Sequence, residues 1–346
     1  MRTESDIRST VLWGAKTTWM GQVATLAGAI PAIRTSLQQS MQRLCNNPEL
    51  FRCRSVVIVK FGLISMMVTL AFIMTAAWLQ LSLEVPLAYT IYWIPLAAGL
   101  LLVCSVASSK LSELLFTVRS KSSLRNVSFT FLGGFLGVVG ATGILSTAFH
   151  IPFVRVCDAS LLTWPFFHAL SRIACINYGC CHGKPLPDAN RFGLVYHHET
   201  SKAVRMSRLR GVLLYPSQVY EMLGCVAVGV IGLLVFWWSD HHGYVTGIYC
   251  ISYGLLRHFL QRYRYEAYTE RKFFRILSYQ KALTGAFCAI GLYAVVIAAI
   301  QGVVIESNFD LSRLHELIWI LPSAGAASVL VFLGYGVHHD KVGQWF

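Results

Sequence analysis

Long apolar stretches recur along the whole chain and decide what it can fold into. Eight of them approach the ~20 apolar residues that a helix needs to cross a lipid bilayer. They cover residues 56–80, 87–106, 127–149, 158–179, 215–238, 244–261, 283–305 and 316–338, the fourth and sixth being more polar than the rest. Hydrophobic residues make up 55% of the chain and charged residues only 13%, which excludes a water-soluble domain. We predict an all-α polytopic integral membrane bundle of seven to eight transmembrane helices.

Positive charge alternates between the loops that join these stretches. The loops after even-numbered spans and the two termini hold 24 of the 29 Lys and Arg residues, whereas the other loops hold two and the spans three. Cytoplasmic loops of membrane proteins carry such a basic excess. The net charge of +13 is thus explained by topology, and we expect no nucleic-acid partner. The count places both termini of a multi-pass protein in the cytoplasm.

The chain divides into a membrane domain with two appendages. Residues 1–55 form a basic extension, in which residues 10–37 make either an amphipathic surface helix or a poorly ordered tail. The extension lacks the apolar core of a secretory signal peptide. Residues 56–305 form the membrane domain, with a loop at 180–214 that is long enough to suggest a function. Residues 306–346 add a C-terminal transmembrane helix and a tail.

Three polar islands interrupt the spans, at residues 171–183, 214–221 and 252–264. A charge within lipid costs about 2.5–3.5 kcal/mol per residue on insertion scales, so an ionisable residue there needs a partner, a function or an escape to the surface. In the third island Tyr253, Arg257 and Gln261 are spaced by four and share a helix face. Arginine suits phosphate recognition, and the alternative is a side chain that snorkels to the surface.

The second island places a carboxylate, Glu221, about one helical turn into its span. A carboxylate at that depth requires a cation, and the available ones are Arg172 and Arg257. Such a pair either serves a function or only tightens the bundle. Further upstream, Asp158 follows a short loop and is expected at the membrane interface.

The first island is the richest in chemistry. His168 and Arg172 lie four apart on one helix face, and Gly179 and Gly183 bracket an expected tight turn. Four side chains near that turn are possible soft-metal ligands: Cys175, Cys180, Cys181 and His182. Their spacing matches no common zinc pattern, so we predict no bound metal and no other cofactor. A thiol- or metal-dependent membrane enzyme remains an alternative.

In this order, the islands resemble motifs of the bacterial prolipoprotein diacylglyceryl transferase family, over about residues 56–300. The most specific match is at 215–221, where Tyr-Pro-Ser-Gln-Val-Tyr-Glu resembles the family's His-Pro-Ser-Gln-x-Tyr-Glu. Residues 253–261 resemble Tyr-Gly-x-x-Arg-x-x-x-Glu, with Gln261 in place of the Glu.

Two other motifs are less complete. Residues 171–183 keep the Arg, the small residue and the final Gly of Gly-Arg-x-(Gly/Ala)-Asn-Phe-x-Asn-x-Glu-x-x-Gly, with Cys175 for the first Asn and Cys180 for the Glu. The family's His-Gly-Gly is Leu-Gly-Gly at 132–134, so Leu132 stands where the essential His is expected. Three glycines in this region also suit ordinary close packing of helices.

The resemblance implies a diacylglyceryl-transferase-like fold in the bacterial inner membrane. The family moves a diacylglyceryl group from phosphatidylglycerol to the thiol of a lipobox cysteine, in lipoprotein biosynthesis. The implied partners are phosphatidylglycerol or another anionic phospholipid and a lipobox-type peptide. The implied catalytic residues are Arg172, Arg257, Glu221, Tyr253 and His182. The implied substrate-binding residues are Gly133, Gly134, Gln218, Gln261, Gly183, Cys175 and Cys180.

Two departures from the family leave alternatives open. Without the motif His, either His182 or His168 would have to serve as the base, or the chain is a non-catalytic relative that binds or transports phospholipid. Family members have seven spans with the amino terminus outside, whereas the charge count gives eight spans with the amino terminus inside. The resemblance and the charge count therefore predict opposite membrane orientations for the site.

Overall fold

The computed structural model describes residues 35–53, 56–116, 131–187, 192–265, 272–273, 277–305 and 310–339. The expected amphipathic segment at 10–37 lies almost entirely outside these residues. Residues 35–45 are helical. Eight long helices follow: α2 (Lys60–Ser82), α3 (Leu87–Phe116), α4 (Phe131–Ala148), α5 (Phe153–Tyr178), α7 (Ser217–Trp238), α8 (Tyr244–Leu260), α9 (Tyr279–Gln301) and α10 (Leu317–Gly336).

Each expected span coincides with one of these helices. Four helical segments are long and apolar enough to cross a membrane: Lys60–Ser82, Leu87–Ser108, Ser217–Trp238 and Leu311–Gly336, the last including the 3-10 turn η1 (Leu311–Glu316). Shorter apolar stretches occur in α4 (Gly133–Ala148) and α9 (Thr284–Ile300). The chain is thus mostly helical with several helices of membrane-spanning length, and the crossing of the bilayer by all eight stays a prediction.

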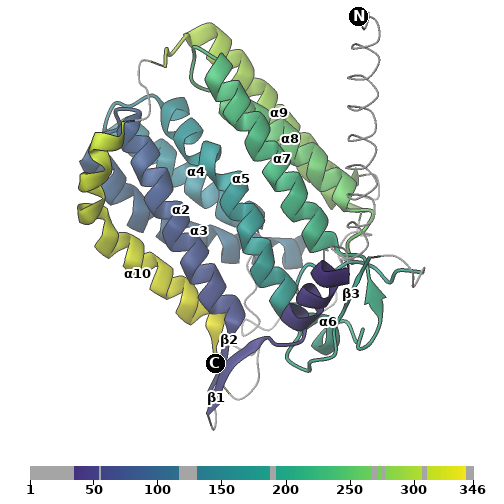
Figure 1. The fold of residues 1–346 in the computed structure, drawn as a ribbon. Coiled ribbons are helices and arrows are strands. Elements are labelled where there is room, and N and C mark those ends of the chain that lie inside the picture. The colour runs from purple at the N-terminus through teal and green to yellow at the C-terminus, as the bar shows by residue number, and fades with distance from the viewer. Residues whose placement is uncertain are drawn as a thin grey trace, which may run out of the picture.

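The helices pack in a chain of neighbours, as Figure 1 shows. Helix α10 packs on α2, α2 on α5, α5 on α7, α7 on α8 and α8 on α9, while α3 and α4 form a close pair. Helix α5 therefore lies between the α2 side and the α7–α9 side of the bundle. Two of the three islands flank this α5–α7 contact, and the third is on α8.

Short strands mark one end of the bundle. Strand β2 (Val56–Val59), directly before α2, pairs antiparallel with β1 (Glu49–Cys53) and with β7 (Val337–His339), directly after α10. The same end carries α6 (Lys202–Arg205) and the pair β3 (Leu194–Val195) and β4 (Leu213–Leu214) (Figure 1). We call it the loop end. A further hairpin, β5 (Lys272–Phe273) with β6 (Leu277–Ser278), precedes α9.

The described chain begins and ends at the loop end, as the charge alternation predicts for an even number of spans. Residues 35–45 are tied to the 180–214 loop and to α5. Asn46 Nδ2 donates to the Val195 carbonyl at 3.1 Å, and Asn177 Nδ2 donates to the Leu44 carbonyl at 2.8 Å. The side of the membrane on which the loop end lies stays a prediction.

Apolar side chains cover the outside of the bundle, and polar ones lie inside it. Leu223 and Val230 on α7 are exposed, whereas Gln80 and Glu221 have no exposed surface. Three exposed tryptophans gather at the end opposite the loop end: Trp237, Trp238 and Trp319. Aromatic side chains favour the membrane–water interface, so this arrangement is that of a protein in lipid.

Asp158 has buried hydrogen-bond partners. Helix α5 begins at Phe153, five residues before the expected start of its span, and Asp158 is buried. Its carboxylate accepts hydrogen bonds from the backbone N–H groups of Gly243 (2.6 Å) and Thr246 (2.9 Å), and from the Thr246 hydroxyl (2.6 Å). Asp158 is therefore a buried residue that satisfies the free N–H groups at the start of α8, and its depth in the membrane stays a prediction.

Candidate functional site

Three guanidinium groups converge on one carboxylate near the loop end. Glu221, one turn into α7, is fully buried. Its Oε1 lies 3.0 Å from Arg172 Nη2 of α5 and 3.9 Å from Arg257 Nη1 of α8. Its Oε2 accepts from Arg264 Nη1, in the turn after α8, at 2.8 Å. Residues from three helices and one turn thus share one ionic centre, which we call the arginine cluster (Arg172, Arg257, Arg264 and Glu221).

Two aromatic side chains complete the cluster. The Tyr253 hydroxyl donates to Glu221 Oε1 at 3.4 Å. His168 Nε2 lies 3.9 Å from the same oxygen and is hydrogen-bonded to Arg172 Nη2. The rings of His168 and Tyr253 lie 5.3 Å apart, and Tyr249 stacks on Tyr253 at 5.7 Å. These rings close the cluster toward the middle of the bundle.

Positive charge is concentrated in the cluster. Three guanidinium groups surround one carboxylate, and Arg172 and Arg264 are themselves buried. Arg172 Nε is a buried donor that has no hydrogen-bond partner in the part of the chain that is described. A buried donor without a partner is costly, and an anionic ligand would supply an acceptor. Guanidinium groups match phosphate oxygens in geometry as well as charge, so the cluster is suited to hold a phosphate group.

Gln261 lies directly after α8, between Arg257 and Arg264 in sequence. Both polar atoms of its carboxamide are buried and lack a hydrogen-bond partner within the described ranges. A buried amide without partners is costly. It therefore offers one donor and one acceptor to a polar ligand beside the arginines.

A tight turn brings three thiols together next to the cluster. Gly179 ends α5 in the left-handed conformation (φ 71°), and Cys181 is also left-handed (φ 55°). The Sγ atoms of Cys175, Cys180 and Cys181 all lie within 4.8 Å of one another. Arg172 Nη1 lies 3.5 Å from Cys175 Sγ and 3.7 Å from Cys181 Sγ. We call this the thiol turn (Cys175, Cys180 and Cys181); it shares Arg172 with the arginine cluster.

Thiol and guanidinium groups shift the acidity of one of these cysteines. Hydrogen bonds from the Cys175 and Cys180 thiols hold the pKa of the Cys181 thiol well below its ordinary value. The guanidinium groups of Arg264 and Arg172 act in the same direction. Electrostatic stabilisation of a thiolate by neighbouring cations is the usual origin of a reactive or metal-binding cysteine.

Ser217, Gln218 and Gly183 support the thiol turn. The Ser217 hydroxyl donates to the Cys181 carbonyl and Gln218 Nε2 to the Cys180 carbonyl, both at 2.9 Å. Gly183 forms a backbone bridge with Arg264, and a Cβ there would collide with the Tyr215 carbonyl. Ser217 and Gln218 of the second island, and Gly183 of the first, thus position the groups around the site.

The two histidines predicted as candidate bases have different surroundings. His168 lies inside the arginine cluster. His182 is directed into the loop, where Nε2 bonds Ser207 Oγ at 3.0 Å and the ring stacks on Tyr265 at 5.3 Å. Burial lowers the pKa of His182. The imidazole is therefore largely neutral near pH 7.

Gly133 and Gly134 lie where α4 meets α3. A Cβ at Gly133 would collide with the Cys104 carbonyl, and one at Gly134 would approach Ser105 Oγ at 2.9 Å. They permit close packing of these two helices. Their role in substrate binding stays a prediction, as does the catalytic or binding role of each of the other residues named above.

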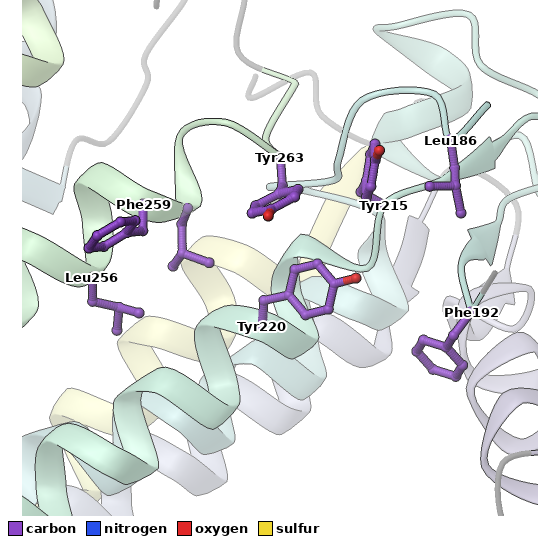
Figure 2. A pocket seen from close by; sticks show the side chains of 8 residues that line it. Leu186, Phe192, Tyr215, Tyr220, Leu256, Phe259 and Tyr263 are labelled. Atoms are coloured by element: carbon purple, nitrogen blue, oxygen red, sulfur yellow. The ribbon is translucent and has the colours of Figure 1, made fainter. Parts of the chain in front are cut away.

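An aromatic cavity of about 590 Å³ opens between α7, α8 and the 180–214 loop, and its lining holds sequence neighbours of the cluster residues rather than the cluster residues themselves. Figure 2 shows Tyr220 and Tyr263 on one wall, next in sequence to Glu221 and Arg264. The Tyr263 ring lies 5.5 Å from that of Tyr220 and 5.4 Å from that of Tyr215. The full lining is Leu186, Phe192, Tyr215, Tyr220, Leu256, Phe259, Leu260 and Tyr263. Such a wall suits acyl chains with a polar group at one end.

Sequence reasoning placed Arg264 at the end of the third polar island but did not name it as a site residue. A signal was present, because Arg257, Gln261 and Arg264 follow the spacing i, i+4, i+7 of one helix face. The chain leaves the helix after Leu260, but the turn keeps Arg264 on the same side. The bridge to Gly183 holds it there.

Comparison with known proteins adds an independent finding. The sequence model of the family described as prolipoprotein diacylglyceryl transferase matches residues 48–300. The phosphatidylglycerol–prolipoprotein diacylglyceryl transferase of Chlorobaculum tepidum is 24% identical to this chain over 139 residues. The aligned segment covers 39% of this chain and 43% of that protein, less than half of its length.

Proposed function

Because this chain belongs to the prolipoprotein diacylglyceryl transferase family, we propose that it binds phosphatidylglycerol and transfers the diacylglyceryl group to an acceptor thiol. One observation carries the proposal: Arg172, Arg257 and Arg264 converge on a single buried carboxylate, Glu221. An aromatic cavity is lined by Tyr220, Leu256 and Tyr263, which precede Glu221, Arg257 and Arg264 in the sequence. A phosphate and its acyl chains are the complementary ligand.

Transfer of the diacylglyceryl group requires that the departing phosphate be stabilised. The acceptor sulfur forms a bond to the terminal glyceryl carbon, and the bond from that carbon to the phosphate oxygen breaks with its electron pair on oxygen. Preorganised cations at that oxygen lower the barrier. Glu221 orients the guanidinium groups, and the Tyr253 hydroxyl donates to the same carboxylate. The thiol proton ends on the released glycerol phosphate.

The acceptor thiol must also be deprotonated, because thiolate is the nucleophile. Leu132 stands in place of the family's motif His. His168 is inside the arginine cluster and His182 is beside the thiol turn, so we propose these two as the candidate bases. The lipobox-type peptide as acceptor, and the bacterial inner membrane as location, come from the family alone.

A second candidate function is favoured by the same substitution. With Leu132 for His and Cys180 for Glu, the chain could keep the lipid site without the transfer reaction. It would then bind or move an anionic phospholipid. Complementation of a strain depleted of its own transferase separates the two, since only a transferase restores lipoprotein maturation.

The direct test is a transfer assay with labelled phosphatidylglycerol and a lipobox peptide. We expect Arg257→Ala and Arg264→Ala to lower the rate on the order of 100-fold or more, as for loss of a group that stabilises a developing oxyanion. Arg313→Ala is the matched control, because Arg313 is ion-paired with Glu316 at 2.6 Å, at the opposite end of the bundle. Full activity of Arg257→Ala would refute the proposed phosphate site.

A further inference from the structure

We propose that Cys175, Cys180 and Cys181 bind one thiophilic metal cation, with Zn²⁺ as the reference metal. Their Sγ atoms all lie within 4.8 Å of one another. A Zn–S bond is about 2.3 Å, which places two sulfurs of one site roughly 4 Å apart. Small side-chain rotations therefore suffice to close the site. Among the residues that the structure describes, no other group of His, Cys, Asp or Glu has this spacing.

The thiol turn is preorganised by groups outside it. Cys181 adopts a left-handed backbone conformation (φ 55°) that side chains rarely adopt. Hydrogen bonds from Ser217 and Gln218 to the carbonyls of Cys181 and Cys180 hold this conformation. Backbone of this kind persists where the surroundings enforce it, and it gathers at functional sites.

Charge and access also fit a metal. Three thiolates around a divalent cation carry a net charge of −1, and Arg172 lies 3.5 and 3.7 Å from two of the sulfurs to balance it. Cys175 is buried, whereas Cys180 and Cys181 are partly exposed, which leaves a path for the ion. Thiolate ligands select soft metals such as zinc over the hard cations magnesium and calcium.

Three protein ligands leave the fourth position of a tetrahedral ion open, as in catalytic zinc sites. Resting on the proposed function, we assign that position to the acceptor thiol. Coordination releases the thiol proton, and the metal-held sulfur forms the bond to the glyceryl carbon while the carbon–oxygen bond breaks toward the phosphate. The phosphate oxygen takes up the proton. The metal would replace the base that is missing at Leu132.

Metal binding is measured on the full-length protein without an oligohistidine tag, reduced and treated with chelator. Zn²⁺ is titrated against a chromophoric competitor, and Co²⁺ serves as a spectroscopic probe. We expect one Zn²⁺ per chain and a thiolate-to-cobalt charge-transfer band. Cys175→Ser, Cys180→Ser and Cys181→Ser should each weaken binding on the order of 100-fold. Cys250→Ser, another buried cysteine, should bind as the wild type does.

The outcomes separate this site from the proposed function. Equal Zn²⁺ affinity of the wild type and Cys181→Ser overturns the site, as does a disulfide within the thiol turn that persists in the reduced, folded protein. Zn²⁺ binding is measured without lipid, so a negative transfer assay would not change the metal-binding result. Full transfer activity after complete metal removal would overturn the assignment of the acceptor thiol to the metal.

Discussion

Two buried carboxylates of this bundle have opposite surroundings. Asp158, at the end opposite the loop end, accepts from two backbone N–H groups and a hydroxyl at the start of α8. Glu221, near the loop end, is surrounded by guanidinium groups from α5, α8 and the turn after α8. Neither carboxylate is accessible to water.

The difference separates a structural carboxylate from one that belongs to a site. The hydrogen-bond donors to Asp158 are neutral groups at a helix start, and the one ionisable neighbour recorded among the described residues is the His242 imidazole, with Nδ1 3.6 Å from Asp158 Oδ2. The partners of Glu221 are three guanidinium groups from separate segments of the chain. The second arrangement gathers several cations at one point, where an anionic ligand would be stabilised, and the sequence neighbours Tyr220 and Tyr263 line an aromatic cavity.

The largest effect is expected at Glu221. Glu221→Gln leaves three guanidinium groups without their carboxylate, and removal of one partner of a buried ion pair costs about 3–5 kcal/mol. We expect a lower unfolding temperature in detergent and loss of transfer. Added phosphatidylglycerol should raise the unfolding temperature of the variant more than that of the wild type, since its phosphate replaces the missing charge. An equal shift in both proteins would contradict the cluster as its binding site.

The next effect is expected at Arg264. Arg264→Lys keeps the charge but loses the planar fork, so phosphate binding and transfer should fall on the order of 10-fold to 100-fold, with stability little changed. Steady-state kinetics of transfer measure this. Arg313→Lys, at the far end of the bundle, should behave as the wild type. If Arg264→Lys has the same transfer kinetics as the wild type, the planar geometry of the Arg264 guanidinium group is unimportant for transfer.

A smaller effect, on stability alone, is expected at Asp158. Asp158→Asn weakens the bonds to Gly243 and Thr246, and an unsatisfied buried N–H costs about 1–3 kcal/mol. Thermal unfolding should shift downward while the response to phosphatidylglycerol stays that of the wild type. If the variant instead loses the lipid response at full stability, the contrast between the two carboxylates fails.

The smallest effect is expected at Gly179. An alanine there would hold a left-handed conformation that costs roughly 1–2 kcal/mol, and its Cβ would collide with Ser201 Oγ. We expect modest destabilisation and a weakened thiol turn, with phosphatidylglycerol binding retained. Gly325→Ala, where a Cβ meets no neighbour, is the control for thermal unfolding. Equal unfolding temperatures of the two variants would contradict this role for Gly179.

Much of this arrangement follows from sequence patterns. The apolar stretches predicted every long helix, and the four-residue spacing placed Tyr253 and Arg257 on the face that meets Glu221. Arg172 was expected as a partner of Glu221, and the structure places it at 3.0 Å. These predictions succeeded because helical periodicity and the cost of charge in lipid act locally.

The rest depends on contacts that no local pattern encodes. Arg264 reaches the cluster through a turn and a bridge to Gly183, some eighty residues earlier in the chain. A tight turn was expected from Gly179 and Gly183, but the left-handed backbone of Cys181 and the approach of the three sulfur atoms to within 4.8 Å were not predicted. Asp158 is buried because α8 starts beside it. The start of α8 agrees with the expected span at 244–261, but α5 starts five residues before its expected span, and the contact between the two helix starts was not predicted.

The central claim is that the arginine cluster holds the phosphate of an anionic phospholipid. Native mass spectrometry of the purified protein, released from mixed phosphatidylglycerol and phosphatidylcholine, tests it most directly. We expect one retained phosphatidylglycerol on the wild type and on Arg313→Ala, and loss of that preference in Arg264→Ala. Equal retention of phosphatidylglycerol by Arg264→Ala and Arg313→Ala would contradict the account.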